Sequence, residues 1–148
     1  MTDFAPRPAS RDPIGARRIV IADDHEPTRV LLRVLIELEG MDVVGEAEDG
    51  TEAVALTLRH EPDVVLLDVN MPCLDGLGAA AIIRASRPRT RLVLHTGEPL
   101  DTALDRAAAL ELPVADKRDL HLTIRQLTAS REGDAARRVR PRRVSCEA

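Results

Sequence analysis

The chain carries three aspartates, one threonine and one lysine whose side chains together could transfer a phosphoryl group: Asp23, Asp24, Asp68, Thr96 and Lys117. Three carboxylates brought close together repel one another unless a cation lies among them. Carboxylate oxygens favour a hard ion such as Mg²⁺. A metal ion, an ammonium group and a hydroxyl around one carboxylate form a phosphoryl-transfer site. There the carboxylate attacks phosphorus while the cations neutralise the phosphoryl oxygens.

Lys117 is the only lysine among 21 basic residues. Ammonium and guanidinium groups differ in shape and hydration, so a single lysine indicates a position where arginine would not serve. Chance retention of one lysine is the alternative.

The two cysteines, Cys73 and Cys146, have no zinc-ligand spacing with the four histidines. They lie far apart in the sequence, which gives no disulfide framework and suits a reducing compartment.

Five apolar runs alternate with segments of helical periodicity. The runs cover residues 19–22, 43–44, 64–67, 92–94 and 112–115. Continuous apolar runs are typical of strands that are buried on both faces of a parallel sheet. The helical segments run from Pro27 to Gly40 and over residues 53–58, 77–83, 103–110 and 120–127. This alternation predicts an α/β fold with an open, doubly wound, five-stranded parallel sheet.

The candidate residues follow the expected strands. Asp23 and Asp24 come directly after the first strand, and Asp68 ends the third. Thr96 ends the fourth strand, and Lys117 follows the fifth. Ligands of open parallel sheets bind beyond the carboxyl ends of the strands, near the point where strand order reverses. We therefore expect these side chains to converge at one edge of the sheet.

Because these residues follow the expected strands in this order, the chain resembles the receiver domain of two-component response regulators over about residues 17–130. The resemblance rests on Asp23-Asp24-His25, on Asp-Val-Asn-Met-Pro-Cys-Leu-Asp-Gly at residues 68–76, on Thr96-Gly97 and on Lys117. It implies the flavodoxin-like receiver fold. The first two motifs are similar to the subfamily that usually carries a helix-turn-helix output domain.

The resemblance also implies a division of labour at the site. Asp68 would be the phosphoacceptor, taking a phosphoryl group from a histidine kinase or phosphotransfer protein. Mg²⁺ would be held by Asp68, directly by Asp24, largely through water by Asp23, and by the backbone carbonyl of Asn70. The chain would thus be a phosphoprotein of a phosphorelay. It would be a signalling receiver and no enzyme beyond its own phosphoryl transfer and slow hydrolysis.

The remaining roles concern the response to phosphorylation. Thr96 would hydrogen-bond the phosphoryl oxygen and Lys117 would pair with it. Gly76 would form the turn into the third helix. The fourth strand, the helix after it and the last strand–helix pair would form the output surface, which changes contacts with a downstream protein partner or a second copy of the chain.

Two departures leave alternatives open. Receivers usually carry an aromatic residue shortly before the lysine, near Val114 here, but Phe4 is the only aromatic residue of this chain. That departure favours a receiver-like interaction module that works without phosphorylation. A phosphatase with an aspartate nucleophile would need an acid two residues after Asp68, where Asn70 stands. An asparagine does not donate a proton in that way.

Several residues also have a purely structural interpretation. Asp23 and Asp24 could cap the helix that starts near Pro27, and Asp75 could be a turn residue before glycine. His25 and His95 flank the expected site as packing or surface histidines. Cys73 lies beside the acceptor, where a redox role has little support.

The flanks differ from the central part. Residues 1–16 are expected to form a flexible leader without a signal sequence, and residues 131–148 a basic tail without a fold of its own. The tail carries a net charge of +3, so residues 1–130 carry −7. A helix-turn-helix domain needs roughly 60 residues, far more than residues 131–148 supply. We therefore expect a stand-alone receiver or part of a longer protein. Cytoplasmic location and no membrane contact are expected, with nucleic acid reached only through the tail.

Overall fold

A computed structural model of the chain describes residues 17–129. The predicted leader (1–16) and basic tail (131–148) lie outside the described residues. The strands are β1 (Arg18–Ala22), β2 (Asp42–Ala47), β3 (Val64–Asp68), β4 (Arg91–Thr96) and β5 (Val114–Asp116). The helices are α1 (Glu26–Leu38), α2 (Gly50–His60), α3 (Gly76–Ser86), α4 (Leu100–Ala107) and α5 (Leu120–Ala129). Two short 3₁₀ turns, η1 (Ala108–Leu110) and η2 (Lys117–Asp119), flank β5.

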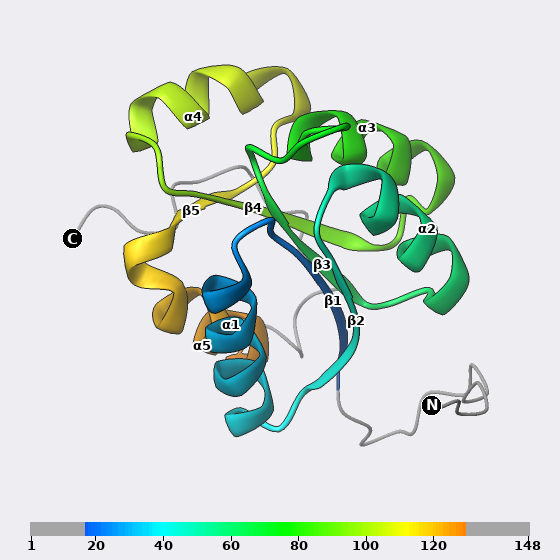
Figure 1. Cartoon of the computed structure of the whole chain (residues 1–148), viewed down its shortest axis with the longest axis vertical. Coiled ribbons are helices and arrows are strands. Elements are labelled where there is room, and N and C mark those ends of the chain that lie inside the picture. Colours follow the sequence, from blue (N-terminus) through cyan, green and yellow to red (C-terminus); the bar gives the residue numbers. More distant parts are fainter. Residues whose placement is uncertain (1–16, 130–148) are drawn as a thin grey trace.

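The strands form one parallel sheet with the order β2-β1-β3-β4-β5. Helices cover both faces, with α1 and α5 together on one side and α2, α3 and α4 on the other (Figure 1). This architecture confirms the predicted doubly wound fold. The chain moves outward from β1 to β2 and then returns to place β3 on the other side of β1. The strand order therefore reverses between β1 and β3, where a ligand site is expected.

Each face of the sheet has its own hydrophobic cluster. Leu32 and Ile36 of α1 pack with Ile124 and Leu127 of α5 against one face, in a cluster that also contains Leu66 of β3. The cluster on the opposite face joins α2, α3 and α4 to alternate strand residues. All five residues of β3 are buried, because this central strand is covered from both sides. A buried strand with neighbours on both sides gives a rigid support for the residues at its carboxyl end.

The start of α1 rules out a capping role for the two aspartates that precede it. His25 occupies the N-cap position; its side chain makes no capping hydrogen bond, and its Nδ1 lies 2.8 Å from the Thr28 hydroxyl instead. Pro27 lies in the first turn, as predicted, and Gly40 follows the helix with a φ of 83°. This conformation is accessible to glycine at little cost. The capping interpretation of Asp23 and Asp24 is therefore wrong, and the aspartates need another explanation.

The predicted elements differ from the observed ones mainly at the sheet edges. The edge strand β2 extends well beyond residues 43–44, and most of its residues are only half-buried, so its apolar signal is short. The helix predicted over residues 103–110 becomes α4 followed by the turn η1. Glu111 then adopts a left-handed φ of 53°, and Pro113 removes a backbone donor before β5 begins. Val114, near the expected aromatic position, is fully buried.

Among residues 17–129, no helix is both long and apolar enough to span a bilayer.

Candidate functional site

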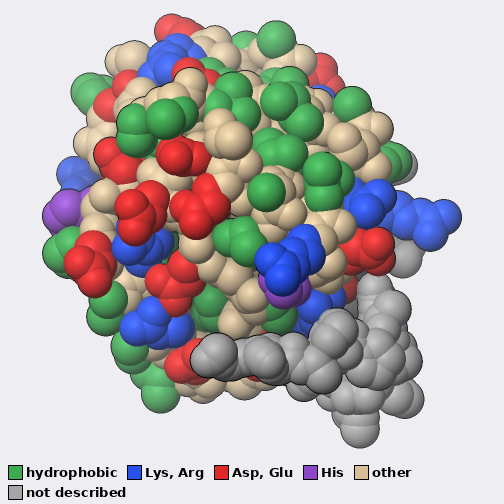
Figure 2. Space-filling model, turned by 45° about the vertical axis from the view of Figure 1, so that its right-hand side comes forward, with side chains coloured by type: hydrophobic (Ala, Val, Ile, Leu, Met, Phe, Trp, Pro, Cys, Tyr) green, Lys and Arg blue, Asp and Glu red, His purple; other side chains and the backbone are tan. Residues whose placement is uncertain are grey.

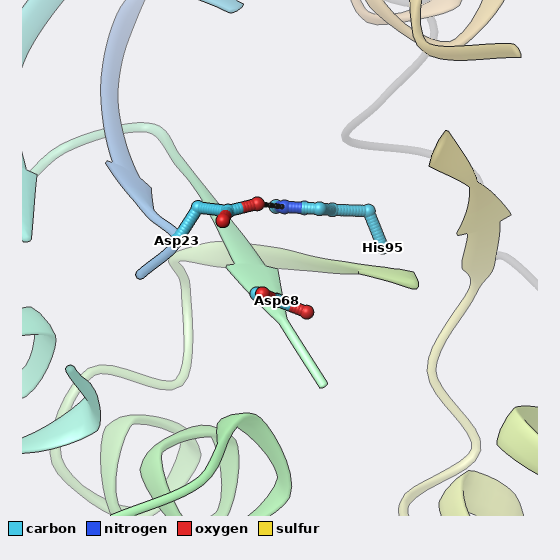
Figure 3. Close-up of side chains that lie close together, drawn as sticks. All are labelled: Asp23, Asp68 and His95. Carbon is cyan, nitrogen blue, oxygen red and sulfur yellow. Dashed lines mark hydrogen bonds and ion pairs between the residues drawn. The ribbon is translucent and has the colours of Figure 1, made fainter. Parts of the chain in front are cut away.

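Three side chains from three different strands meet at the carboxyl edge of the sheet. Asp23 follows β1, Asp68 ends β3, and His95 is the penultimate residue of β4. Figure 3 shows Asp23 and His95 pointing toward one another across the end of β3, with Asp68 beside them. Potential ligand atoms of the three residues all lie within 4.8 Å of one another, and all three residues are buried. The strand order places them together, because β3 lies between β1 and β4.

Lys117 completes this cluster from the fifth strand. It follows β5 directly as the first residue of η2. Its Nζ lies 2.8 Å from Asp23 Oδ2 and 3.2 Å from Asp68 Oδ2. The expected convergence of Asp23, Asp68 and Lys117 is therefore observed. We call Asp23, Asp68, His95 and Lys117 the pocket floor.

The other candidate residues lie next to the floor but make different contacts. Thr96 is buried, and its hydroxyl accepts a hydrogen bond of 3.0 Å from the Glu98 N–H. Asp24 is exposed and is not part of the compact Asp23, Asp68 and His95 group. Asn70 is also exposed, and its backbone N–H donates to Asp68 Oδ1 at 3.2 Å. The structure thus groups two of the three aspartates and leaves Asp24 facing solvent.

Burial and pairing separate the two floor aspartates electrostatically. Burial disfavours the charge on Asp23, but hydrogen bonds from His95 and Lys117 outweigh it and hold the pKa of that carboxyl well below its usual range. Burial raises the pKa of the Asp68 carboxyl, and the Asp23 charge acts in the same direction, while His95 and Lys117 oppose this shift. Burial alone would lower the pKa of Lys117, yet the two carboxylates raise it. Asp23 is thus the better stabilised anion, while Asp68 carries the less favourable charge.

His95 is the floor residue that sequence reasoning missed as part of the site. Its side chain is completely buried, and its Nε2 lies 2.9 Å from Asp23 Oδ2. The expectation of a plain packing or surface histidine is thus incomplete. The pairing register of β3 and β4 reveals this role. His95 pairs with Asp68 across the parallel ladder, and laterally paired residues point to the same face of a sheet.

Gly76 lets α3 begin close to the acceptor strand. A Cβ at this position would lie 2.1 Å from the carbonyl oxygen of Asp68. The Gly76 N–H also donates to Val69 O at 3.0 Å. The preceding Asp75 is the N-cap of α3, accepting a hydrogen bond from the Gly78 N–H at 2.8 Å. Gly76 therefore forms the expected turn into the third helix, and Asp75 has the expected local role.

A second group of charges lies next to the pocket floor and nearer the surface, where α4 meets the segments that follow β3 and β4. The Arg106 guanidinium of α4 donates to Asn70 Oδ1 at 2.9 Å and to Glu98 Oε2 at 3.1 Å. It also lies 3.4 Å from Asp75 Oδ2. We call Arg106, Asn70, Asp75 and Glu98 the rim network. Mixed charges of this kind are common on the surface, and Figure 2 shows basic side chains set among gathered acidic ones.

Known proteins share this sequence pattern. The model of the response regulator receiver domain matches residues 19–116. A protein-glutamate methylesterase/protein-glutamine glutaminase of Haloarcula marismortui is 42% identical over 96 residues, which are 62% of this chain and 26% of that protein. The transcriptional regulatory protein PdtaR of Mycobacterium tuberculosis is 45% identical over 78 residues, 53% of this chain and 38% of PdtaR. The matched region thus spans less than half the length of these relatives.

Solved structures share the fold. The receiver domain of AraT, a response regulator from Geobacillus stearothermophilus, has a TM-score of 0.70 and 30% identity, covering 81% of this chain and 98% of that one. The receiver domain of RcsB from Escherichia coli, at 22% identity, has a TM-score of 0.71 and shows the fold alone; 81% of this chain and 95% of that chain are covered. The family match covers well over half of the chain. The chain therefore belongs to the response regulator receiver domain family of two-component signalling.

Proposed function

We propose that Asp68 is the phosphoacceptor of this receiver. The observation that carries the proposal is its place in the pocket floor: Asp68 ends the central strand and is 3% exposed, and its Oδ2 lies 3.2 Å from the Lys117 ammonium. A carboxylate with a fixed cation beside it is suited to attack phosphorus, because the cation neutralises the charge on the transferred group.

The donor would be a phosphohistidine of a histidine kinase or phosphotransfer protein. An Asp68 oxygen forms the new O–P bond while the N–P bond to the donor imidazole breaks, and the bonding electrons leave with the imidazole nitrogen. Lys117 stays near the phosphoryl oxygens. Thr96 loses the hydrogen bond that its hydroxyl accepts from the Glu98 N–H, and the hydroxyl then donates to one of the phosphoryl oxygens. The product is an aspartyl phosphate whose formation needs no other co-reactant.

The oxygen ligands at the pocket fit Mg²⁺. Asp24 and Asp68 offer carboxylates and Asn70 a backbone carbonyl, which suits a hard ion. Both oxygens of Asp23 are already engaged, Oδ1 by the His25 N–H at 2.8 Å and Oδ2 by His95 and Lys117. This supports a role for Asp23 through water rather than as a direct ligand. The ion would neutralise phosphoryl oxygens during transfer.

A docking surface for the phosphodonor protein lies beside the pocket. Helix α1 starts three residues after Asp23 and exposes an apolar stripe of Val30, Leu31, Val34 and Leu38. Exposed apolar groups at helical spacing favour contact with another helix. Leu31, 49% exposed, lies in the second turn of α1 and so toward the end of the helix that is near the site. A Leu31→Glu variant should slow transfer from a cognate kinase several-fold while leaving the reaction with acetyl phosphate unchanged.

The output is proposed to pass through protein contact. Phosphorylation would alter the surface of β4, α4, β5 and α5 toward a downstream partner or a second copy of the chain. The chain would act in the cytoplasm as a signalling receiver and not as an enzyme. Nucleic acid would be reached only through the arginines of residues 131–148. Salt-sensitive retention on DNA that is lost on deleting this segment would support that contact.

Intact-mass analysis tests the acceptor. The full chain is incubated with acetyl phosphate, with Mg²⁺ or with a chelator, and compared with Asp68→Asn and Asp63→Asn. Asp63 is a matched control because it lies at the opposite end of β3, where its carboxylate accepts the Arg18 N–H. A Mg²⁺-dependent gain of one phosphoryl group is expected for the wild type and for Asp63→Asn, and none for Asp68→Asn.

Failure of the wild type would be checked with a cognate kinase. If a folded wild-type chain takes no phosphoryl group from either donor, the proposal is wrong and the phosphorylation-independent module becomes the better reading. If Asp68→Asn gained as much phosphoryl group as the wild type, the acceptor would be a different residue.

A further inference from the structure

His95 is a fully buried polar side chain directly at the site. Along β4, Val93 belongs to the hydrophobic cluster under α1 and α5, and His95, two residues on, faces the same side. Burying an imidazole is costly unless it makes a hydrogen bond. In residues 17–129, Nδ1 has no hydrogen-bond partner, whereas Nε2 lies 2.9 Å from Asp23 Oδ2. The Asp23 contact therefore accounts for the polar side chain at this position.

Two donors share one oxygen of Asp23. His95 Nε2 lies 2.9 Å and Lys117 Nζ 2.8 Å from Asp23 Oδ2, while Lys117 also reaches Asp68. An ionised carboxylate only accepts hydrogen bonds, so Nε2 carries the proton in this contact. If Lys117 moves away, His95 still satisfies the oxygen. Without His95, moving Lys117 would leave a buried carboxylate oxygen with no side-chain donor, which is costly.

We propose that His95 is a positioning residue for phosphoryl transfer, holding Asp23 so that Lys117 can pass from Asp23 to the phosphoryl group on Asp68. This inference rests on the proposed role of Asp68. His95 touches neither the phosphoryl group nor the attacking oxygen and acts through Asp23 and Lys117. Replacing it with an apolar residue leaves Lys117 as the sole side-chain donor to Asp23 Oδ2, which tightens that pair and slows transfer.

Three variants of the full chain separate the hydrogen bond from the volume of the ring. His95→Leu fills the space without a donor. His95→Gln keeps an N–H at about the reach of Nε2, and His95→Asn keeps an amide that is one methylene too short. The control is Thr57→Val, since Thr57 is another fully buried polar residue whose hydroxyl bonds Ala53 O inside α2, away from the floor.

The first measurement is the initial rate of phosphoryl incorporation from acetyl phosphate with Mg²⁺, followed by intact mass. We expect His95→Leu and His95→Asn to lose roughly tenfold or more, because misplaced catalytic groups lose rate steeply. His95→Gln should stay within about threefold of the wild type, and Thr57→Val should be unchanged. Rescue by glutamine identifies the N–H donor, which a role in packing alone would not require.

The second measurement uses the single lysine. Incorporating ¹³Cε-labelled lysine gives one signal for Lys117, because the chain has no other lysine. The signal of the free protein should shift in His95→Leu and His95→Asn, and should stay at the wild-type position in His95→Gln and Thr57→Val. This readout needs no phosphorylation, so it tests the inference even if the proposed acceptor role fails.

The outcomes are distinguishable. The inference is overturned if a folded His95→Leu or His95→Asn chain incorporates the phosphoryl group at the wild-type rate and its Lys117 signal does not move. The role of Asp68 would then stay intact. Equal losses in His95→Gln and His95→Leu also overturn it, because the donor alone would not suffice. If His95→Leu does not fold, the comparison between His95→Asn and His95→Gln decides the question.

Discussion

The carboxyl edge of the sheet carries two charged clusters that differ in depth. In the pocket floor, Asp23 and His95 are completely buried, and the Lys117 side chain is 23% exposed. In the rim network, the side chains of Arg106 and Asp75 are 35% and 41% exposed. Both clusters join segments that are far apart in the sequence. They lie side by side, because Asn70 of the rim also donates its N–H to Asp68.

The difference in depth decides what each cluster does. Buried charges interact through a low effective dielectric, so losing one partner leaves the other poorly solvated. The floor accordingly shifts the pKa values of Asp23, Asp68 and Lys117. Exposed charges are screened by water and salt, and their pairs contribute little to stability. The floor should therefore affect both folding and chemistry, while the exposed ion pairs of the rim should contribute little to folding.

The largest effect is expected from Lys117→Met. The substitution leaves two buried carboxylates without their shared cation, and should lower the free energy of unfolding by about 3 kcal/mol, the low end for a broken buried pair because Lys117 is partly exposed. Urea unfolding followed by far-UV circular dichroism measures this, as the chain has no Trp or Tyr. Mg²⁺ should restore part of the loss, since a bound cation replaces the missing charge. A variant as stable as the wild type without Mg²⁺ would contradict the floor assignment.

A steric test follows with Gly76→Ala and Gly97→Ala. At position 76 the new methyl group meets the Asp68 carbonyl oxygen at 2.1 Å, so the backbone under the floor must move. At position 97 the nearest atom is Lys117 Cδ at 3.7 Å, an ordinary contact. We expect a loss of about 1–3 kcal/mol for Gly76→Ala and a change within about 0.5 kcal/mol for Gly97→Ala. Thermal unfolding of both variants checks this, and equal stabilities would disprove the close approach.

The pH dependence of Asp68→Asn tests the sign of the floor electrostatics. The raised pKa means that folded Asp68 holds its proton more tightly than the unfolded chain does. This contribution to stability is present below the unfolded pKa of about 3.9 and is lost as pH rises through the folded pKa. In Mg²⁺-free buffer, Asp68→Asn should therefore gain in melting temperature over the wild type as pH rises from 4 to 7. A gain that shrinks over this range would mean that His95 and Lys117 together outweigh burial in setting the pKa of Asp68.

The sequence alone predicted the fold and the convergence of Asp23, Asp68 and Lys117, and the structure confirms both. Strand–helix alternation determines the layers, and the carboxyl-end rule determines where functional side chains gather. The polar residues that follow the first, third and fifth apolar runs were therefore sufficient. Whether Asp68 accepts the phosphoryl group, and whether Asp24 and Asn70 bind the metal, stay predictions.

The contacts of His95 and Arg106 could not be predicted in the same way. The role of His95 depends on which residue it pairs with across β3 and β4, and register is a property of the folded sheet. Arg106 lies on a helix whose end is a 3₁₀ turn, so its direction follows from packing. The edge strand β2 was also poorly bounded, because its half-buried residues lack a continuous apolar run. The other edge strand, β5, is buried but only three residues long, so its apolar signal is short.

The smallest effect is expected from Arg106→Ala. The guanidinium contacts three acceptors, yet it is 35% exposed, so the variant should lose less than about 1 kcal/mol, and less still in high salt. Urea unfolding at low and high salt measures this, with Arg87→Ala as a control, because Arg87 forms a similarly exposed pair with Glu61 away from the pocket. If Arg106→Ala instead lowered the free energy of unfolding as much as Lys117→Met, the rim charges would be as costly to unpair as the buried charges of the floor. The division between the two clusters would then be wrong.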